Sequence, residues 1–479
     1  MLKDNKKKKL IIVAIDGGNF PVINPFLEKK LLPNLASFKH KANLISVIPP
    51  ATAVAWASFS TGNNPGKTEI YDFTLVDDFS WKVEFLNRKR LQGKPLWQYL
   101  SEAGVKSCFI NLPVTYPPDE INGVIVSGIE TPSTMCQYTY PSDLKDTLNK
   151  LGYEIEVSGL KEKKEDIVEE AENILDKRIR AAKFLFQRDF DFFIVLFRAS
   201  DIVQHFAWDK PVVEEVHKKI DDFIGYVRKK DPNAEVMVIS DHGIEKIEKV
   251  FNINSWLEQE GYLFTKIKKA SILSSLGITR KNIFYFLEKT KLNFLIRYIP
   301  RSLGKKIPVE NISFEEALST GLIDMEKTRA VAKRSVKTAQ IFLNDTDRKG
   351  IVKKEEEEII QKEIKEKLEK FFNERAIKAI IKTKAELYGE KARFAPDVTL
   401  YLEEKTYEIS ASFTDKGIWV PLGKEEAEHC LSGIILTNLG LNLNNARIID
   451  LAPTILDYFK VLYKKDSFDG RSLFDSKSL

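Results

Sequence analysis

Cysteine is scarce in this sequence. Three cysteines, Cys108, Cys136 and Cys430, are spread over 479 residues. So few and so widely spaced, they exclude a disulfide-rich scaffold and form no CxxC metal knuckle. Sparse unpaired cysteine is typical of a reducing compartment, so we expect a cytoplasmic protein.

Long hydrophobic runs are also absent. No segment has 18 uninterrupted apolar residues, so we expect no membrane span. The apolar stretch 10–15 is too short for the hydrophobic region of a signal peptide and runs directly into Asp16, so we interpret it as a buried strand. The segment 270–305 mixes apolar and basic residues. We interpret it as part of a packed cap, with contact to a membrane surface or a lipid-like substrate as the alternative.

The chain has little net charge outside its first residues. The formal net charge is +5, and residues 1–9 contribute five lysines and one aspartate to it. The remainder is almost neutral, so bulk charge gives no indication of a nucleic-acid partner. A composition of 43% hydrophobic and 30% charged residues is that of a folded protein.

Short apolar runs alternate with helical patterns along most of the chain. The runs are 10–15, 107–112, 124–128, 192–197 and 236–240, and the longest helical patterns are 164–187 and 212–229. This alternation predicts an α/β fold around a largely parallel, buried sheet. Residues 259–395 differ, because they include the highly charged amphipathic segment 353–373, which we interpret as a helix with a solvated face. We therefore expect a catalytic core formed by 1–258 and 396–479, with 259–395 as an inserted cap.

Three of the predicted strands are followed by an aspartate. Asp16 follows the first strand, Asp201 comes shortly after 192–197, and Asp241 follows 236–240. Ligands of open α/β sheets bind at the carboxyl ends of the strands, so these acids should converge at one edge.

Two histidines accompany these acids. His205 lies four residues after Asp201, so the two face the same way if a helix begins there. His242 follows Asp241 directly, before Gly243. Carboxylate and imidazole together suit Zn²⁺ or Mn²⁺. We interpret His40 and His217, which lie in lysine-containing polar stretches, as residues without a ligand role.

Thr52 lies in the segment PPATAVAWASFSTGNNPGK (49–67), which has the pattern of a tight loop leading into a helix. A helix N-terminus offers free N–H groups to a phosphate, and a metal would lower the pKa of the threonine hydroxyl enough to make it a nucleophile. The alternative is that Thr52 merely caps the helix. The local sequence leaves both open.

Taken together, the segments IDGG (15–18), 49–67, SDIVQHFAW (200–208) and SDHG (240–243) resemble the alkaline phosphatase superfamily. The resemblance is to its type I phosphodiesterase/nucleotide pyrophosphatase branch, and within it to cytoplasmic phosphohydrolase/phosphomutase-like proteins of archaea and bacteria. It extends through NLPVTYPP (111–118) to ARIIDLAPTILDYF (446–459) and so covers nearly the whole chain. It implies a three-layer, alkaline-phosphatase-like core with an inserted cap.

The resemblance also implies residue roles. One of two divalent ions, Zn²⁺ or Mn²⁺, would be held by Asp16, Thr52, Asp241 and His242, and the other by Asp201, His205 and His429. Spacing alone makes His429 only a candidate; the family pattern, a histidine shortly before a glycine and an apolar strand, selects it. Thr52 would attack phosphorus and form a phosphothreonine intermediate. The backbone N–H of Ala53 and the side chain of Asn111 are candidate substrate contacts.

These residues predict a phosphodiesterase acting on a small phosphorylated substrate. Two alternatives stay open: a phosphomonoesterase or phosphomutase that uses the same metals, and a catalytically silent scaffold that keeps the fold. The presence of all seven expected site residues argues against the scaffold.

Overall fold

A large mixed sheet forms the centre of the molecule. The computed structural model describes residues 8–157, 163–266, 312–415, 417–423 and 425–474. The strand order is β2-β18-β9-β1-β8-β5-β6-β7. Strands β9, β1, β8, β5 and β6 run parallel, whereas β18 and β7 pair antiparallel with their neighbours. The bounds are β1 Leu10–Ile15, β2 His40–Ile45, β5 Ser107–Ile110, β6 Gly123–Val126, β7 Thr139–Tyr140, β8 Phe192–Phe197, β9 Glu235–Ile239 and β18 Ser432–Thr437.

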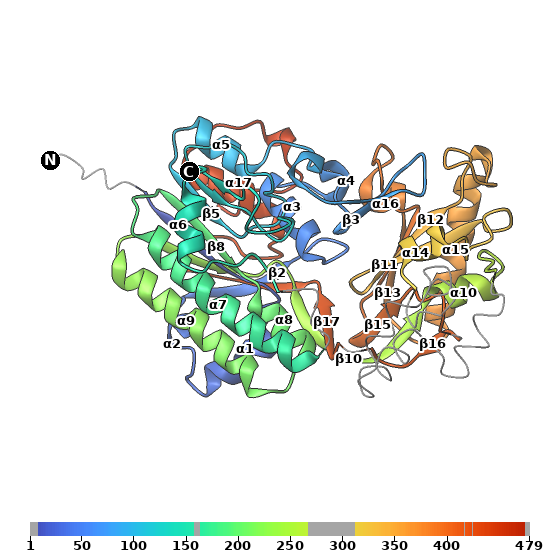
Figure 1. Cartoon of the computed structure of the whole chain (residues 1–479), viewed down its shortest axis with the longest axis horizontal. Coiled ribbons are helices and arrows are strands. Elements are labelled where there is room, and N and C mark those ends of the chain that lie inside the picture. Colours follow the sequence, from blue (N-terminus) through green and yellow to red (C-terminus); the bar gives the residue numbers. More distant parts are fainter. Residues whose placement is uncertain (1–7, 158–162, 267–311, 416, 424, 475–479) are drawn as a thin grey trace, which may run out of the picture.

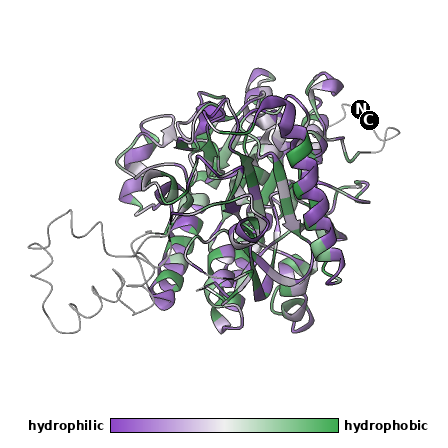
Figure 2. Ribbon diagram, turned by 90° about the vertical axis from the view of Figure 1, so that its right-hand side faces the viewer, coloured by the Kyte–Doolittle hydropathy of each residue, from purple (hydrophilic) through white to green (hydrophobic). Residues whose placement is uncertain are grey.

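Helices cover both faces of this sheet and make a three-layer core (Figure 1). Alternate residues of β1 point to opposite faces, so Ile11 and Val13 join one apolar cluster and Leu10 and Ile12 join the other. Because both faces are covered, the strands are continuous apolar runs, as Figure 2 shows by their colour. One face carries α1 Phe20–Glu28, α2 Pro33–Ala36, α6 Leu144–Lys150, α7 Lys164–Phe186, α8 Ala199–Phe206 and α9 Pro211–Lys230; the other carries α3 Thr52–Thr61, α5 Leu96–Glu102 and α17 Leu451–Tyr458. The predicted α/β class and three-layer core are confirmed.

A second lobe is built on a smaller antiparallel sheet of order β11-β12-β14-β13. The long strand β10 leads into it from the core and pairs with β15, β16 and β17. The bounds are β10 Gly243–Asn252, α10 Ile253–Gln259, α14 Phe314–Ser319, β11 Ala330–Ser335, β12 Thr338–Leu343, α15 Lys354–Asn373, β13 Ala379–Thr383, α16 Lys384–Tyr388, β14 Val398–Leu402, β15 Thr406–Ser410, β16 Trp419–Val420 and β17 Ala427–Cys430. A short helix, α4 Pro65–Thr68, and the hairpin β3 Thr74–Val76 and β4 Val83–Phe85 extend from the core towards this lobe (Figure 1).

The second lobe is wider than the expected insertion 259–395. Strand β14 begins after residue 395 yet pairs with β12 and β13, and Trp256 and Leu257 belong to the apolar cluster of the second lobe. Both expected boundaries therefore fall inside this lobe. The physical reason is that β10 runs as one continuous strand from the core into the lobe. The sequence therefore has no polar linker there to mark the boundary.

The charged segment 353–373 forms helix α15, close to its expected bounds. Ile360, Ile364, Leu368 and Phe372 are buried on one side of it, at helical spacing. They pack into the apolar cluster of the second lobe, and the charged residues occupy the remaining faces. The segment 270–305 lies outside the described residues.

No helix in the described ranges is long and apolar enough to cross a bilayer.

Candidate metal and active site

The three strand-end aspartates meet at one edge of the large sheet. Strand β1 lies between β8 and β9, and all three run parallel, so their carboxyl ends coincide. Asp16 follows β1, Asp241 follows β9 by one residue, and Asp201 lies in the first turn of α8, directly after β8. All three side chains are buried. The convergence predicted from the sequence is confirmed.

Gly17 allows this close approach. Its φ is +67°, a left-handed conformation that residues with a side chain rarely adopt. A Cβ at this position would lie 3.2 Å from Oδ1 of Asp201. Glycine therefore lets the turn after β1 bring Asp16 beside the start of α8.

Three histidines direct their Nε2 atoms at these aspartates. His242 Nε2 lies 3.1 Å from Asp16 Oδ1 and 3.4 Å from Asp241 Oδ2. His205 Nε2 and His429 Nε2 lie 3.2 and 3.1 Å from Asp201 Oδ1 and 3.0 Å from each other. His429 comes from β17, which pairs antiparallel with β10 and so places His429 opposite Ile244, two residues after His242.

The ring orientations leave all three Nε2 atoms available as ligands. Nδ1 of His205 lies 2.7 Å from the carbonyl oxygen of Ala427, and Nδ1 of His429 lies 2.8 Å from that of Pro50. Nδ1 of His242 lies 3.1 Å from its neighbour's carbonyl oxygen. A carbonyl only accepts, so each Nδ1 must donate a hydrogen, which leaves the lone pair of a neutral ring on Nε2. His40, exposed on β2, and His217, buried in α9, belong to no metal-ligand group of the described residues.

The donor set fits divalent metal ions. Both carboxylate oxygens of Asp241 are buried without a hydrogen-bond partner, as is one oxygen each of Asp16 and Asp201. Burial, and then the carboxylates of Asp16 and Asp201, raise the pKa of Asp241 well above its ordinary value. Buried carboxylates that crowd one another in this way are stable when a cation lies between them. Potential ligand groups are Asp16 with Asp241 and His242, Asp201 with His242 and His429, and His205 with Glu428 and His429.

The charge on Asp201 is stabilised differently. Burial raises its pKa, but His205 and His429 outweigh burial and hold the pKa well below its ordinary value. Conversely, burial lowers the pKa of His205, but Asp201 outweighs it and raises the pKa to about 10. In the absence of a metal, protonated imidazole therefore supplies the positive charge on this side of the cluster.

Thr52 opens helix α3 at the same edge. All ten residues of this helix are buried, and Oγ1 of Thr52 lies 3.2 Å from Nε2 of His242. The helix N-cap is Ala51, and no side chain caps the helix. The alternative that Thr52 merely caps the helix is therefore wrong: its hydroxyl points into the cluster instead.

Arg198 is a site residue to which the sequence analysis assigned no role. Its Nε donates to Asp16 Oδ2 at 2.9 Å, another of its nitrogens pairs with Glu156, and a third lies 3.7 Å from Asp201 Oδ2. It therefore fixes the oxygen of Asp16 that faces away from His242. Its place at the end of β8, three residues before Asp201, was the signal in the sequence.

Glu428 was also missed. It is 2% exposed, precedes His429, and accepts the backbone N–H of His429 at 2.9 Å. Although burial raises its pKa, Arg334 and then His205 hold the pKa at about 2, so Glu428 is ionised. Its position beside a candidate ligand histidine could have suggested it, but its partner Arg334 is far away in the sequence.

The two candidate substrate contacts lie in different surroundings. Ala53 is buried in the first turn of α3, where helix geometry leaves backbone N–H groups without an intrahelical partner. The side chain of Asn111 donates to the carbonyl oxygen of Leu196 at 3.2 Å and lines a small cavity behind Arg198 rather than the pocket that contains Thr52. The structure thus brings the seven candidate metal ligands together, with Ala53 next to Thr52, and places Asn111 in a small cavity that Arg198 also lines.

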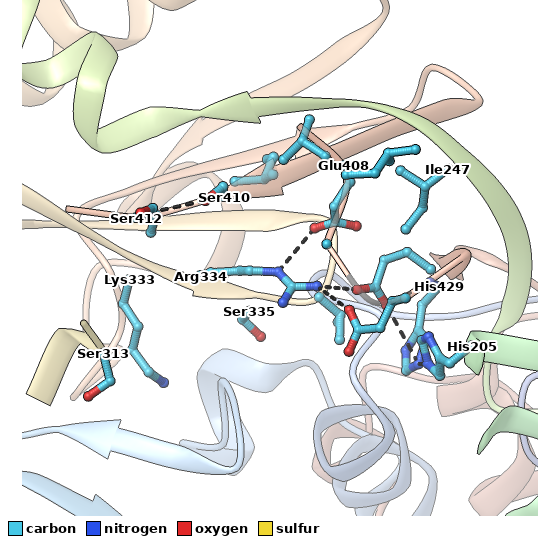
Figure 3. Close-up of a pocket in the computed structure, with 18 of the residues that line it drawn as sticks. His205, Ile247, Ser313, Lys333, Arg334, Ser335, Glu408, Ser410, Ser412 and His429 are labelled. Carbon is cyan, nitrogen blue, oxygen red and sulfur yellow. Dashed lines mark hydrogen bonds and ion pairs between the residues drawn. The ribbon is translucent and has the colours of Figure 1, made fainter. Parts of the chain in front are cut away.

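A pocket of about 770 Å³ opens from this cluster between the two lobes. Thr52, Asp201, His205 and His429 line it from the core. Arg334 and Lys333, from β11 of the second lobe, line it on the other side. Figure 3 shows Arg334 reaching across the pocket towards His429 and His205, with Glu408 beside it. The second lobe therefore supplies the far wall of the site.

The sequence model of one family, described as type I phosphodiesterase/nucleotide pyrophosphatase, matches residues 10–429. This chain belongs to that family. It is therefore a metal-dependent hydrolase of the phosphodiesterase/nucleotide pyrophosphatase type. Comparison with curated proteins gives no match.

Solved structures share the fold of this family member. A phosphonoacetate hydrolase from Sinorhizobium meliloti, in complex with phosphonoformate, is 14% identical with a TM-score of 0.58 over 95% of each chain. Human ectonucleotide pyrophosphatase/phosphodiesterase 5 is 12% identical with a TM-score of 0.53 over 97% of each chain. An inactive threonine-to-alanine variant of its murine counterpart, in complex with AMP, is 12% identical with a TM-score of 0.50 over 97% of each chain. At these identities the likeness shows the alkaline-phosphatase-like fold.

Proposed function

We propose that this chain is a phosphodiesterase that transfers the phosphoryl group of a small phosphodiester first to Thr52 and then to water. One observation carries the proposal: the Thr52 hydroxyl lies within 3.2 Å of His242 Nε2, inside a buried cluster of three aspartates and three histidines. A hydroxyl in such a place is positioned as a nucleophile, because a divalent ion held by these side chains would favour its deprotonated form. The inactive threonine-to-alanine variant of the murine structural neighbour is consistent with a threonine of this kind.

Two divalent ions, Zn²⁺ or Mn²⁺, would be held by Asp16, Asp241, His242 and Thr52 on one side and by Asp201, His205 and His429 on the other. When bound, they would supply Lewis-acid stabilisation of negative charge on the transferring phosphoryl group. Glu428 adjoins the second set and would orient His429 through its backbone N–H.

The protein's own groups account for the course of the reaction. Oγ1 of Thr52 forms the new bond to phosphorus as the bond to the leaving alcohol breaks, and water later replaces Thr52. The backbone N–H of Ala53, in the first turn of α3, would donate to a phosphoryl oxygen. Arg198 holds Asp16 in place throughout.

The test uses protein stripped of metal and then reloaded with Zn²⁺ or Mn²⁺. Bis(p-nitrophenyl) phosphate is assayed beside p-nitrophenyl phosphate, with Thr52→Ala as the nucleophile variant. Thr61→Ala is the matched control, since Thr61 is equally buried at the other end of α3 and its hydroxyl donates to the Ala57 carbonyl oxygen rather than to the cluster. Metal-dependent diester cleavage that Thr52→Ala abolishes and Thr61→Ala retains is the expected result.

Other outcomes favour the alternatives. Faster cleavage of the monoester would favour a phosphomonoesterase or phosphomutase on the same site. No turnover and no bound metal would favour a silent scaffold.

A further inference from the structure

The second metal-ligand set has a further carboxylate beside it. His205 Nε2 and His429 Nε2, which lie 3.0 Å apart, form one potential ligand group with a carboxylate oxygen of Glu428. All ligand atoms of this group lie within 4.8 Å of one another. Figure 3 shows the two imidazole rings together, on the side of the pocket to which Arg334 points. Glu428 is therefore a fourth possible donor beside Asp201, His205 and His429.

The distances within this set are those of atoms that share one ion. Two ligand atoms with bonds of about 2.1 Å, at angles between about 90° and 180°, are about 3.0–4.2 Å apart. Asp201 Oδ1 lies 3.2 Å from His205 Nε2 and 3.1 Å from His429 Nε2. Oε1 of Glu428 lies 3.8 Å from His429 Nε2. The separation between Glu428 and His429 therefore falls in the same range as those between the expected ligands.

Two contacts turn the carboxylate of Glu428 towards these histidines. Glu428 and His429 are adjacent in β17, and side chains of adjacent strand residues normally point to opposite faces. Here Oε1 of Glu428 instead accepts the backbone N–H of His429 at 2.9 Å, and Oε2 pairs with Arg334 of the second lobe. A carboxylate oxygen can accept at two lone-pair positions, so Oε1 keeps one position for an ion.

We propose that Glu428 is a direct ligand of the second divalent ion, in addition to Asp201, His205 and His429. The proposal rests on the two-ion site of the proposed function and adds a ligand to it. Carboxylate oxygen suits Mn²⁺, whereas imidazole suits Zn²⁺. A second carboxylate in this set therefore shifts the preference of the second site towards Mn²⁺.

A direct and an indirect role of Glu428 have opposite effects on metal preference. If Glu428 binds the ion, its loss removes an oxygen ligand and weakens Mn²⁺ binding more than Zn²⁺ binding. If Glu428 only orients His429 through the backbone N–H, its loss disturbs an imidazole ligand and weakens Zn²⁺ binding at least as much as Mn²⁺ binding.

The binding test titrates Mn²⁺ and Zn²⁺ separately into metal-free protein by calorimetry. Glu428→Gln keeps the size of the side chain and a carbonyl oxygen that can accept the His429 N–H. We expect this variant to weaken one Mn²⁺ site by at least about 100-fold, beyond what loss of an outer contact usually costs, and to weaken Zn²⁺ binding less. A smaller loss of Mn²⁺ affinity, or an equal or larger loss of Zn²⁺ affinity, would overturn the proposal.

Two further variants locate the effect. Asp201→Asn marks the second site and should weaken the same Mn²⁺ site as Glu428→Gln. Glu425→Gln is the matched control, because Glu425 also lies 3.2 Å from Arg334 and lines the pocket but belongs to no metal-ligand group of the described residues. Glu425→Gln should leave both affinities unchanged. A loss as large as that of Glu428→Gln would assign the effect to the contacts of Arg334 and contradict direct ligation.

A crystal structure of Mn²⁺-loaded wild-type protein needs no variant. The anomalous signal of manganese locates the ions, and we expect Oε1 of Glu428 within about 2.4 Å of the second one. A longer distance would refute the proposed ligand. Manganese bound by Glu428 in a protein that cleaves no diester would support the ligand and refute the proposed function. Diester cleavage without contact between Glu428 and manganese would leave the function standing and refute the ligand.

Discussion

Two substitutions of Thr52 should cost similar stability but differ strongly in their effect on activity. Thr52 is 1% exposed, so Thr52→Val keeps its shape and loses the hydroxyl that contacts His242. Loss of one buried hydrogen bond costs about 1 kcal/mol of unfolding free energy. Thr52→Ser keeps the hydroxyl and loses a buried methyl, at a cost of about 0.8 kcal/mol. Stability alone therefore does not distinguish the two proteins.

Activity should distinguish them clearly. Thr52→Val removes the attacking oxygen, so we expect kcat/KM for bis(p-nitrophenyl) phosphate to fall by at least about 10³-fold, or ~4 kcal/mol. Thr52→Ser retains that oxygen with a less restricted χ1 and should remain within about tenfold of wild type. Release of p-nitrophenolate measures activity, and urea unfolding measures stability.

The matched control is Thr61→Val in the same helix, which loses a buried hydroxyl bonded to the Ala57 carbonyl and should keep full activity. If Thr52→Val remained within tenfold of wild type while fully loaded with metal, the hydroxyl would not be the nucleophile.

Three further predictions concern charge and packing. The pKa of Asp241 is raised in the folded protein, so its burial destabilises the metal-free protein increasingly as pH rises above the ordinary pKa of 3.8. Asp241→Asn should therefore raise the melting temperature of the metal-free protein at pH 7. The same variant should abolish the increase in melting temperature that Zn²⁺ causes in the wild type. Burial raises the pKa of Glu130 from 4.5 to about 7, so ionising this side chain lowers the unfolding free energy above pH 7 but not at pH 4. In urea unfolding, Glu130→Gln should therefore stabilise the protein by about 1–3 kcal/mol at pH 8 and have no effect at pH 4. Equal effects at both pH values would contradict this prediction. Ile364→Ala removes a fully buried side chain of α15 and should cost about 3 kcal/mol in the second lobe, while metal content measured by atomic absorption stays unchanged.

The cluster of aspartates and histidines was predictable because most of its signals are local. Strands β1, β8 and β9 are apolar runs that end in or near an aspartate, and parallel strands place such ends together. Asp201 and His205 lie one helical turn apart, so their pairing follows from sequence spacing. His429 was different: it lies in a strand with no local mark of its role, and the family resemblance selected it.

The residues that were missed act across the lobes or across strands. Arg334 reaches Glu408 and Glu428, which lie 74 and 94 residues away in the sequence. Arg198 fixes Asp16 across 182 residues. The chain is 30% charged, so nothing local singles out Arg334 among its many charged residues. The place of Arg198 at the end of β8 marks it as a candidate but does not reveal Asp16 as its partner.

By itself the sequence determined the class of fold and the inner part of the site, since hydrophobic periodicity and strand-end acids are properties of short segments. Tertiary structure decided the rest. It showed that the Thr52 hydroxyl faces His242 rather than capping α3, and that the second lobe begins within β10 and includes β14. It also placed Glu408 in the pocket wall beside Arg334. These outcomes depend on pairings between distant strands, whose register and partners are fixed by the packing of the whole chain rather than by any one segment.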